Sequence, residues 1–324
     1  MPSPRERGSG TPQYCPPGMV TGAESPAIAC DGVVKRFGSV VALDRLSFEV
    51  ARGRVVGFLG PNGAGKSTTI RILLDLARAD AGTVTVMGVD PRRARPQARR
   101  SIGYLPGELR LDERLSVAET FRSWSRLRGG TVDQAYVAEL CERLDLDPGR
   151  ETKGLSSGNR RKVGLVGAFM ARPELLVLDE PTSGLDPLVQ AEFAEMVDDA
   201  SEAGATVFLS SHVLSEVQRI AEDVVVVRGG RVVSAGSVTD MRHLARQPFR
   251  ATFHGEPPVA ELRAVPGLLD VDVRGSEVTG FVSGPPAALL GVLAQHRVDT
   301  LLMPEPDLED AFMRLYGIDG GEPG

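Results

Sequence analysis

The stretch that decides the fold of this chain is Gly60-Pro61-Asn62-Gly63-Ala64-Gly65-Lys66-Ser67-Thr68. Residues 54–59 before it form a short apolar run with β-branched side chains, and residues 69–76 after it have apolar side chains at helical spacing. A strand, a glycine-rich loop with Lys-Ser and a helix, in this order, are the setting of a phosphate-binding loop. The glycines let several backbone N–H groups point at one anion, and the helix N-terminus adds its unpaired N–H groups. These loop residues are therefore expected to bind a nucleotide.

Two side chains of this loop are expected to have individual roles. Lys66 would reach the β- and γ-phosphates, and the Ser67 hydroxyl would ligate Mg²⁺. The alternative is an ordinary Gly-rich turn. At average residue frequencies the motif arises by chance in roughly one chain in a hundred of this length, and the flanking elements make chance rarer still. The sequence therefore favours nucleotide binding.

The composition limits the class of protein. With 324 residues the chain is long enough for one large domain and a small one. No stretch approaches the roughly 18 apolar residues of a membrane span, so a membrane role is expected to come through a partner. The net charge of −6 argues against nucleic acid as the main ligand, because nucleic-acid-binding proteins usually carry a basic patch. Three cysteines (Cys15, Cys30 and Cys141) show neither metal-ligand spacing nor a paired framework, which fits a reducing cytoplasm.

Four segments follow from the patterns along the chain. Residues 1–26 are rich in Pro, Gly and Ser and are predicted to be a disordered tail. Strands and helices alternate over residues 27–244, which predicts an α/β domain with a mostly parallel sheet covered on both faces. Within it, residues 107–160 show mostly helical spacing and predict a separate lobe. Residues 245–317 are expected to form a small α+β domain, and residues 318–324 a frayed end.

The elements expected within these segments can be given by number. A pair of strands around Gly38-Ser39 is expected within residues 28–50. Further strands are expected at 82–88, 101–106, 174–179, 205–210, 223–227, 231–234, 249–253, 269–273, 277–282 and 298–302. Helices are expected at 92–100, 117–127, 132–144, 163–170, 187–200, 285–295 and 308–316.

Two acidic residues follow the buried strand expected at 174–179. A carboxylate at the end of such a strand can hold Mg²⁺, usually through water, and Asp179 has this position. Glu180 is placed directly after it, where a general base could polarise the attacking water. A pair of solvated acids capping a strand is the alternative, and the phosphate-binding loop makes the functional interpretation the better one.

A third motif makes the set specific. It is Leu155-Ser156-Ser157-Gly158-Asn159-Arg160-Arg161-Lys162, which leads into an apolar helix. It resembles the signature of the ATP-binding cassette (ABC) family, whose usual form is LSGGQ. Further motifs match in order, namely Phe37 for the aromatic that stacks on adenine, Thr182-Ser183-Gly184-Leu185-Asp186 for the loop after the catalytic glutamate, and Ser210-Ser211-His212 for the switch histidine. The resemblance covers roughly residues 27–240.

The resemblance implies a P-loop ATPase fold and a shared ATP site. Two cassettes would face each other head to tail, with Ser156 and the Gly158 backbone donating to the γ-phosphate across the interface. His212 would contact the γ-phosphate in cis, and Asp186 would bridge the subunits. Because the chain has one cassette, it is expected to form a homodimer; pairing with a different cassette chain is the alternative. A surface or core histidine and a simple core Phe37 are the alternatives.

Two residues depart from the family pattern. Ser157 replaces a glycine of the signature, but it is small and keeps its backbone N–H, so binding is expected to survive. The family usually has a glutamine after a strand like residues 102–106, and this glutamine approaches Mg²⁺ and links the site to the membrane partner. Here that place reads Gly107-Glu108. Our hypothesis is that Glu108 substitutes as a metal ligand; the alternative is that the contact is absent.

The form of the signature and the C-terminal stretch Leu308-Glu309-Asp310-Ala311-Phe312-Met313-Arg314-Leu315-Tyr316 resemble one branch of the family. That branch comprises bacterial exporters of drugs, antibiotics or lipids whose permease is a separate polypeptide. By analogy, the chain would supply the energy from the inner face of the cell membrane, with its helical lobe docked on the permease. The alternatives are a soluble ABC ATPase acting on ribosomes, on DNA or in assembly, and an importer ATPase.

Overall fold

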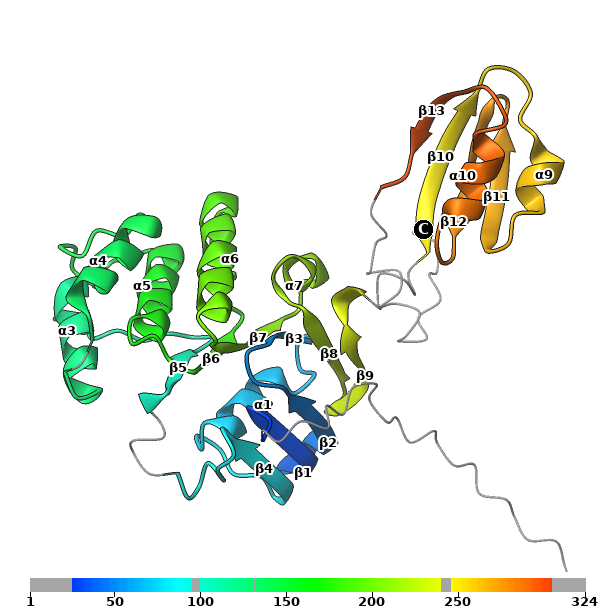
Figure 1. The fold of residues 1–324 in the computed structure, drawn as a ribbon. Helices are drawn as coiled ribbons and strands as arrows, with labels where there is room; N and C mark the ends of the chain where they lie inside the picture. Colours follow the sequence, from blue (N-terminus) through cyan, green and yellow to red (C-terminus); the bar gives the residue numbers. More distant parts are fainter. Residues whose placement is uncertain (1–24, 95–99, 131, 240–245, 305–324) are drawn as a thin grey trace, which may run out of the picture.

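A six-stranded sheet forms the centre of the molecule in the computed structural model, which describes residues 25–94, 100–130, 132–239 and 246–304. Its order is β5-β6-β7-β3-β8-β9, and all neighbours are parallel except β8 and β9 (Figure 1). This is the mostly parallel α/β sheet that the sequence predicts. The strands are β3 (Val55–Leu59), β5 (Ile102–Leu105), β6 (Leu175–Asp179), β7 (Thr206–Ser211), β8 (Asp223–Arg228) and β9 (Arg231–Ser237).

Two hydrophobic clusters cover the two faces of this sheet. Side chains alternate between the faces along a strand, so Val55 and Leu59 of β3 belong to one cluster and Val56 and Phe58 to the other. Every residue of β3, β6 and β7 is buried. A parallel sheet covered on both faces requires such continuous apolar strands, which explains why the sequence shows them as uninterrupted runs.

One face is covered by helix α1 (Lys66–Leu73) and by a three-stranded antiparallel sheet of order β2-β1-β4. Strands β1 (Ile28–Phe37) and β2 (Val40–Val50) form the expected hairpin around Gly38-Ser39, and β4 (Ala81–Val86) pairs with β1. The rings of Phe48, Phe58 and Phe208 lie 5.1 to 5.8 Å apart between the two sheets. These aromatic contacts fix the small sheet against the large one.

The other face is covered by helices α3 (Val117–Leu127), α4 (Gln134–Arg143), α5 (Ser157–Phe169), α6 (Pro187–Glu202) and α7 (Leu214–Ile220). Helix α3 begins with a capping box between Ser116 and Glu119, which satisfies N–H groups at its first turn. Its bounds are those that the sequence predicts. Helix α5 begins at Ser157, earlier than the expected Val163, because the polar signature residues form its first turn. Leu105 of the sheet and Val117 of α3 lie in one cluster, so the helical lobe shares its core with the sheet.

A separate four-stranded antiparallel sheet follows, with its own hydrophobic cluster. Its elements are β10 (Gln247–Phe253), α9 (Val259–Arg263), β11 (Leu268–Arg274), β12 (Glu277–Val282), α10 (Ala287–Leu293) and β13 (Val298–Leu302). The element order β-α-β-β-α-β and the strand order β11-β12-β10-β13 are those of a ferredoxin-like unit. The sequence predicts all of these elements except α9, which is too short to show a helical period.

Several expectations fall outside the described residues. These are most of the tail at 1–26, the middle of the helix expected at 92–100, the helix expected at 308–316 and the end at 318–324. The expected boundary between residues 244 and 245 also lies there and stays a prediction. Among the helices that the structure describes, none combines the length and the apolar character that a membrane crossing requires.

Candidate functional site

The glycine-rich loop lies between β3 and α1 and is held from several sides. Gly65 adopts a φ of +106°, and a Cβ there would lie 2.6 Å from Leu43 Cδ2 and 2.8 Å from the Ala42 carbonyl oxygen, so only glycine fits. The Gly60 N–H donates to the Ser211 carbonyl at 3.2 Å, and the Gly230 N–H donates to the Ala64 carbonyl at 3.1 Å. Strand β2, the end of β7 and the β8–β9 turn therefore fix the loop.

The loop lysine is buried at the centre of this site. Lys66 is 5% exposed, and its Nζ donates to the Gly60 carbonyl at 2.6 Å and to the Pro61 carbonyl at 3.4 Å. The same Nζ forms an ion pair with Glu180 Oε1 at 3.2 Å. The structure thus brings together a lysine and a glutamate that are far apart in the sequence, as the motif interpretation requires.

Glu180 also contacts the histidine of the next strand. Its Oε2 lies 2.8 Å from His212 Nδ1, while its Oε1 faces Lys66. Glu180 has a φ of +51°, a conformation in which few residues other than glycine are found. Such strained positions cluster at functional sites. Lys66, Glu180 and His212 therefore form one chain of polar contacts at the carboxyl edge of the sheet.

One serine orients both acids, and the sequence reasoning gave it no role of its own. The Ser210 hydroxyl donates to Asp179 Oδ1 at 2.7 Å and accepts from the Glu180 N–H at 3.0 Å. Asp179 is 5% exposed and Ser210 is fully buried. The Ser210-Ser211-His212 motif already pointed to this strand end, but its serine could not be assigned a partner without the pairing of β6 and β7.

The residues expected to hold a divalent metal are Ser67, Asp179 and Glu108. No group of three or more His, Cys, Asp or Glu side chains within the described ranges is arranged to bind a metal. A magnesium ion in this site would thus depend mainly on phosphate and water oxygens, which is how Mg²⁺ is usually held beside nucleotides. Ser67 in the first turn of α1 and the buried Asp179 carboxylate at the end of β6 supply oxygens that fit this chemistry.

Glu108 is not brought to this site. Its side chain is 82% exposed and lies 3.6 Å from Arg110. The preceding residue, Gly107, faces the acid instead, since a Cβ on Gly107 would lie 3.0 Å from Asp179 Oδ2. The arrangement favours the alternative in which the glutamine contact of the family is absent from this loop.

Replacement of Glu108 by alanine is expected to leave the Mg²⁺ dependence of ATP hydrolysis unchanged. The reason is that its exposed carboxylate pairs with Arg110 and not with the phosphate-binding loop. The measurement is the Mg²⁺ concentration for half-maximal ATPase activity, compared with Glu113→Ala as a second acid from the same loop. A several-fold increase in that concentration for Glu108→Ala alone would restore Glu108 as a metal ligand.

The signature residues and Asp186 form a second group. Ser156 caps α5, and its Oγ accepts from the Asn159 N–H at 3.2 Å. A Cβ on Gly158 would lie 3.0 Å from the Gly184 carbonyl, so the start of α5 packs against the loop before α6. Asp186 caps α6 by accepting from two backbone N–H groups at 3.0 and 3.1 Å. The exposed hydroxyl of Ser156 accepts one bond within the chain and keeps its proton for a further acceptor.

Phe37 lies at the end of β1 and is 52% exposed. Lys35 Nζ is 5.2 Å from the centroid of its ring. An exposed ring excludes the alternative that Phe37 is a simple core residue. An open aromatic face beside the hairpin turn is suited to stacking on a flat ring.

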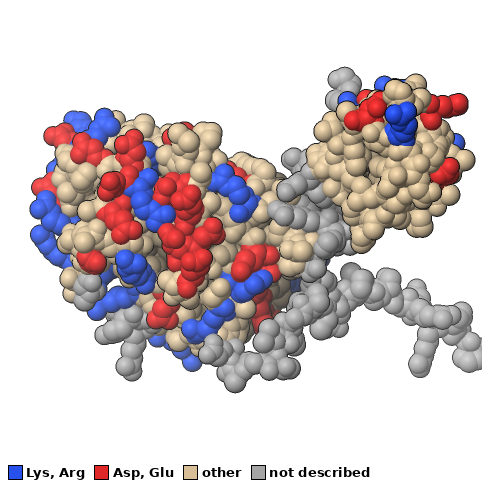
Figure 2. Space-filling model, turned by 45° about the horizontal axis from the view of Figure 1, so that its top comes forward, with Lys and Arg blue, Asp and Glu red and all other residues tan. Residues whose placement is uncertain are grey.

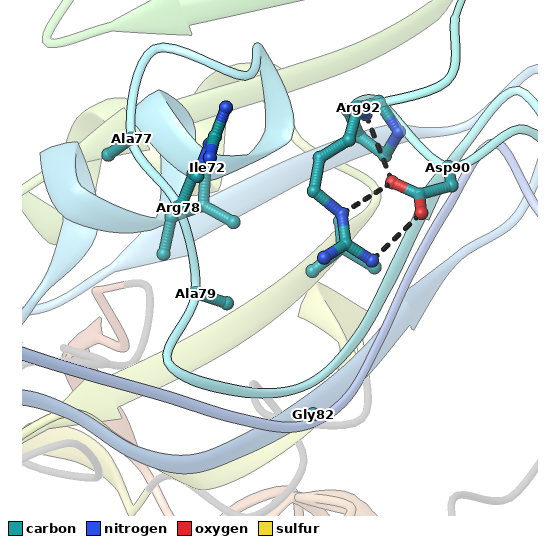
Figure 3. Close-up of a pocket in the computed structure, with 9 residues that line it drawn as sticks. Ile72, Ala77, Arg78, Ala79, Gly82, Asp90 and Arg92 are labelled. Atoms are coloured by element: carbon teal, nitrogen blue, oxygen red, sulfur yellow. Dashed lines mark hydrogen bonds and ion pairs between the residues drawn. The ribbon is translucent and has the colours of Figure 1, made fainter.

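We describe two hollows of the surface that lie near these elements. A cavity of about 30 Å³ lies between the end of α1 and the segment after β4, and Arg92, whose guanidinium pairs with Asp90, is one of its lining residues (Figure 3). The Arg92 guanidinium also holds the pKa of the Asp90 carboxyl below its usual value. This cavity is too small for a nucleotide.

The larger hollow is a groove between the sheet edge and the helical lobe. Its volume is about 280 Å³, and its lining is mainly apolar. Leu127 at its rim is 78% exposed, and Trp124 packs closely on Gly167 of α5. The lining residues are Tyr104, Pro106, Leu109, Trp124, Leu127, Arg128, Gly164 and Gly167.

On the face shown in Figure 2, Lys and Arg side chains alternate with Asp and Glu over the cassette, without an extended basic area among the described residues drawn there.

Comparisons with known proteins agree with this geometry. Residues 43–183 match the family model described as ABC transporter. The daunorubicin resistance ATP-binding protein DrrA3 of Streptomyces coeruleorubidus is 42% identical over 220 residues, which are 67% of this chain and 70% of that protein. The Nod factor export ATP-binding protein I of Mesorhizobium japonicum is 34% identical over 302 residues, 91% of this chain and 88% of that protein. A solved ATP binding subunit of an ABC transporter has a TM-score of 0.61 at 29% identity and covers 67% of this chain and 92% of its own. This chain belongs to the ATP-binding proteins of ABC transporters.

Proposed function

We propose that this ABC ATPase supplies the energy for export of a drug, an antibiotic or a lipid through a membrane permease that is a separate chain. The observation that carries the proposal is the contact of Lys66, Glu180 and His212 beside a phosphate-binding loop. Two relatives are named for daunorubicin resistance and for Nod factor export. These names support export over import and over a role on ribosomes or DNA.

In this proposal Glu180 is the general base for the attacking water. Its carboxylate is held between Lys66 and His212, and its backbone is fixed by Ser210. Phosphate oxygens of ATP compete with Glu180 for Lys66, because both are anionic acceptors for the same ammonium group. Binding of ATP would transfer Lys66 to the phosphates and leave the Glu180 carboxylate next to His212, free to take a proton from water.

Ser67 and Asp179 would hold Mg²⁺. The ion, when bound, neutralises charge that develops on the phosphate oxygens during transfer. The Ser210 hydroxyl donates to Asp179 Oδ1 and so fixes the orientation of this buried carboxylate. It also leaves the second oxygen of Asp179 facing Gly107 and the loop after β5.

A second cassette would complete the ATP site. We propose that Ser156 and the Gly158 N–H of one subunit donate to the γ-phosphate held by Lys66 of the other, with Asp186 at the subunit boundary. The packing of Gly158 on Gly184 ties the signature to the loop that carries Asp186. Phe37 would stack on the adenine ring. Hydrolysis would remove the phosphate that joins the two subunits, and the subunits would separate.

The groove is the proposed docking place for the permease. An apolar helix face of the permease could bury the exposed Leu127 and the ring of Trp124 there. The groove begins at the loop after β5, so its occupant would touch the elements that flank Asp179. In this arrangement the chain is held at the inner face of the membrane by its permease.

The change Leu127→Glu is expected to abolish co-purification of the chain with its permease, which is to be sought as a polytopic protein encoded beside the gene. A charged side chain at the rim would be desolvated in the complex, which is costly without a partner. The measurement is recovery of both chains after affinity purification from membranes. Leu76→Glu is the control, because Leu76 is also exposed, by 64%, but does not line the groove. Recovery of the unchanged chain in soluble or ribosomal fractions alone would contradict the exporter assignment itself.

A further inference from the structure

A buried arginine of helix α5 donates to three backbone carbonyls at the edge of the sheet. Arg161 is 8% exposed. Its Nη1 donates to the Pro106 carbonyl at 2.8 Å and to the Asp179 carbonyl at 3.4 Å, and its Nη2 donates to the Gly107 carbonyl at 3.0 Å. Pro106 and Gly107 follow β5, and Asp179 ends β6. One guanidinium thus joins α5 to the two strand ends beside the phosphate site.

The buried guanidinium of Arg161 carries a positive charge, and burial of a charge is usually unfavourable. The hydrogen bonds that the structure gives to the Arg161 guanidinium all end on uncharged carbonyl oxygens. Burial lowers the pKa of Arg161, and the nearby carboxylates of Asp179 and Glu180 oppose that effect. A guanidinium stays charged in proteins, and its burial is unfavourable unless its donors are satisfied. A well-packed apolar side chain is often at least as stabilising in such a place, so the specific gain is the fixed position of the three carbonyls.

The same loop connects the groove to the acid at the site. Pro106 lines the groove together with Tyr104 and Leu109. Gly107 packs directly on Asp179, since its Cβ would lie 3.0 Å from Oδ2. A group that enters the groove and displaces Pro106 therefore displaces Gly107 as well. Gly107 has no side chain that could reach the site from this loop.

We infer that Arg161 is a positioning residue for ATP hydrolysis that ties the groove and the signature helix to the Asp179 strand end. The inference rests on the proposed roles of Asp179 and Glu180. The loop after β5, which reads Gly107-Glu108 in this chain, is joined to the Asp179 strand end by the guanidinium of α5. Since Ser156 caps the same helix, a shift of α5 on contact with a second cassette would reach Asp179 through the guanidinium of Arg161, which three hydrogen bonds hold in place.

The test is Arg161→Gln in the full chain, with steady-state ATPase kinetics and a separate measurement of ATP affinity. We expect kcat to fall about 10- to 100-fold, because displacement of reacting groups by about 1 Å can have an effect of this size. The Kd for ATP should stay within about twofold, because Arg161 does not touch the phosphate-binding loop and the lost interaction acts on the chemical step. Arg161→Lys keeps the charge but loses the planar fork, and an intermediate kcat is expected.

Arg122→Gln is the control. Arg122 is an exposed arginine of helix α3 and lies outside the signature, so kcat and Kd should both stay unchanged. Thermal unfolding of each variant checks that it folds. If Arg161→Gln does not fold, the kcat of Arg161→Lys tests the inference in its place. An unchanged kcat, or a loss of ATP affinity as large as the loss in kcat, would overturn the inference. Normal turnover by Glu180→Gln in the same assay would instead overturn the proposed site.

Where the permease co-purifies, a second readout follows. Permease-stimulated hydrolysis should fall toward the basal rate in Arg161→Gln, although the complex still forms. Full stimulation in that variant would show that the groove reaches the site by another route and would overturn the inference. If the unchanged chain binds no permease, that result contradicts the exporter proposal. The kinetics of the isolated chain then still test whether Arg161 positions the groups for ATP hydrolysis.

Discussion

Glu180→Gln is expected to lower the rate of ATP hydrolysis by a factor of about 10² to 10⁴, the range that a general base usually contributes. Glutamine has the shape of glutamate but cannot accept the proton of the attacking water. ATP binding should persist, because Lys66 keeps its contacts to the Gly60 and Pro61 carbonyls. The variant also lacks the carboxylate that pairs with Lys66, so ADP and ATP should bind at least as tightly as before. The expected species is an ATP-bound dimer.

Single-turnover hydrolysis and size-exclusion chromatography with ATP measure these outcomes. Glu222→Gln is the control. Glu222 lies just before β8, at the amino ends of the parallel strands and thus away from the phosphate site, and it pairs with Arg54. It should retain normal turnover and show no ATP-dependent accumulation of dimer. Normal turnover in Glu180→Gln would remove Glu180 from the role of base.

Lys66→Ala is expected to reduce ATP affinity by more than tenfold and hydrolysis by about 10² or more, because charge-assisted contacts to phosphate are lost at a buried site. The truncation also leaves the Gly60 carbonyl without its donor and Glu180 without its ammonium partner. The Glu180 carboxylate, no longer paired with an ammonium group, repels the nucleotide phosphates, which adds to the loss.

Nucleotide affinity by equilibrium titration and the ATPase rate measure this prediction. Lys153→Ala removes another lysine from an exposed position and serves as the control. Unchanged ATPase activity in Lys66→Ala would refute the assignment of Lys66 and its loop as the ATP site. A variant combining Lys66→Ala and Glu180→Gln should recover part of the affinity, since the negative charge of Glu180 is gone.

The fold of the cassette was largely predictable because its strands are buried on both faces. Such strands appear as apolar runs, and β3, β6 and β7 lie close to the expected positions. The hairpin around Gly38-Ser39 was predictable from its turn residues. Helix α9 was missed, because Val259–Arg263 is too short to show a period. The start of α5 was placed too late, since polar residues in a first turn look like a loop.

Within the candidate site, motifs predicted which residues would meet but not which way each one faces. Lys66, Glu180 and His212 come together as the motifs require. Neighbours in a loop are different, because sequence alone does not show which of Gly107 and Glu108 is directed at Asp179. The structure turns Glu108 to solvent and sets Gly107 on the acid.

The hydrogen bonds of Arg161 and Ser210 could not be predicted from the sequence, because they depend on how separate elements pack together. Arg161 has several rotatable bonds, so its position in the signature does not tell which carbonyls it reaches. Its contacts with Pro106 and Asp179 depend on how three separate elements pack. The Ser210 hydroxyl acts across two strands, and that contact follows from the register of β6 and β7.

The anchoring of the phosphate-binding loop affects how much conformational entropy is lost when a nucleotide binds and how much is lost in later steps. Gly65 is wedged against Ala42 and Leu43, and the backbone of Ala64 is held by Gly230. A loop fixed in this way is preorganised, so little conformational freedom remains to be lost when a nucleotide arrives. Binding of a nucleotide to this loop therefore loses little conformational entropy. In the proposed arrangement of two cassettes, the larger ordering cost would fall on their encounter, which makes that encounter the step most open to control by the proposed membrane partner.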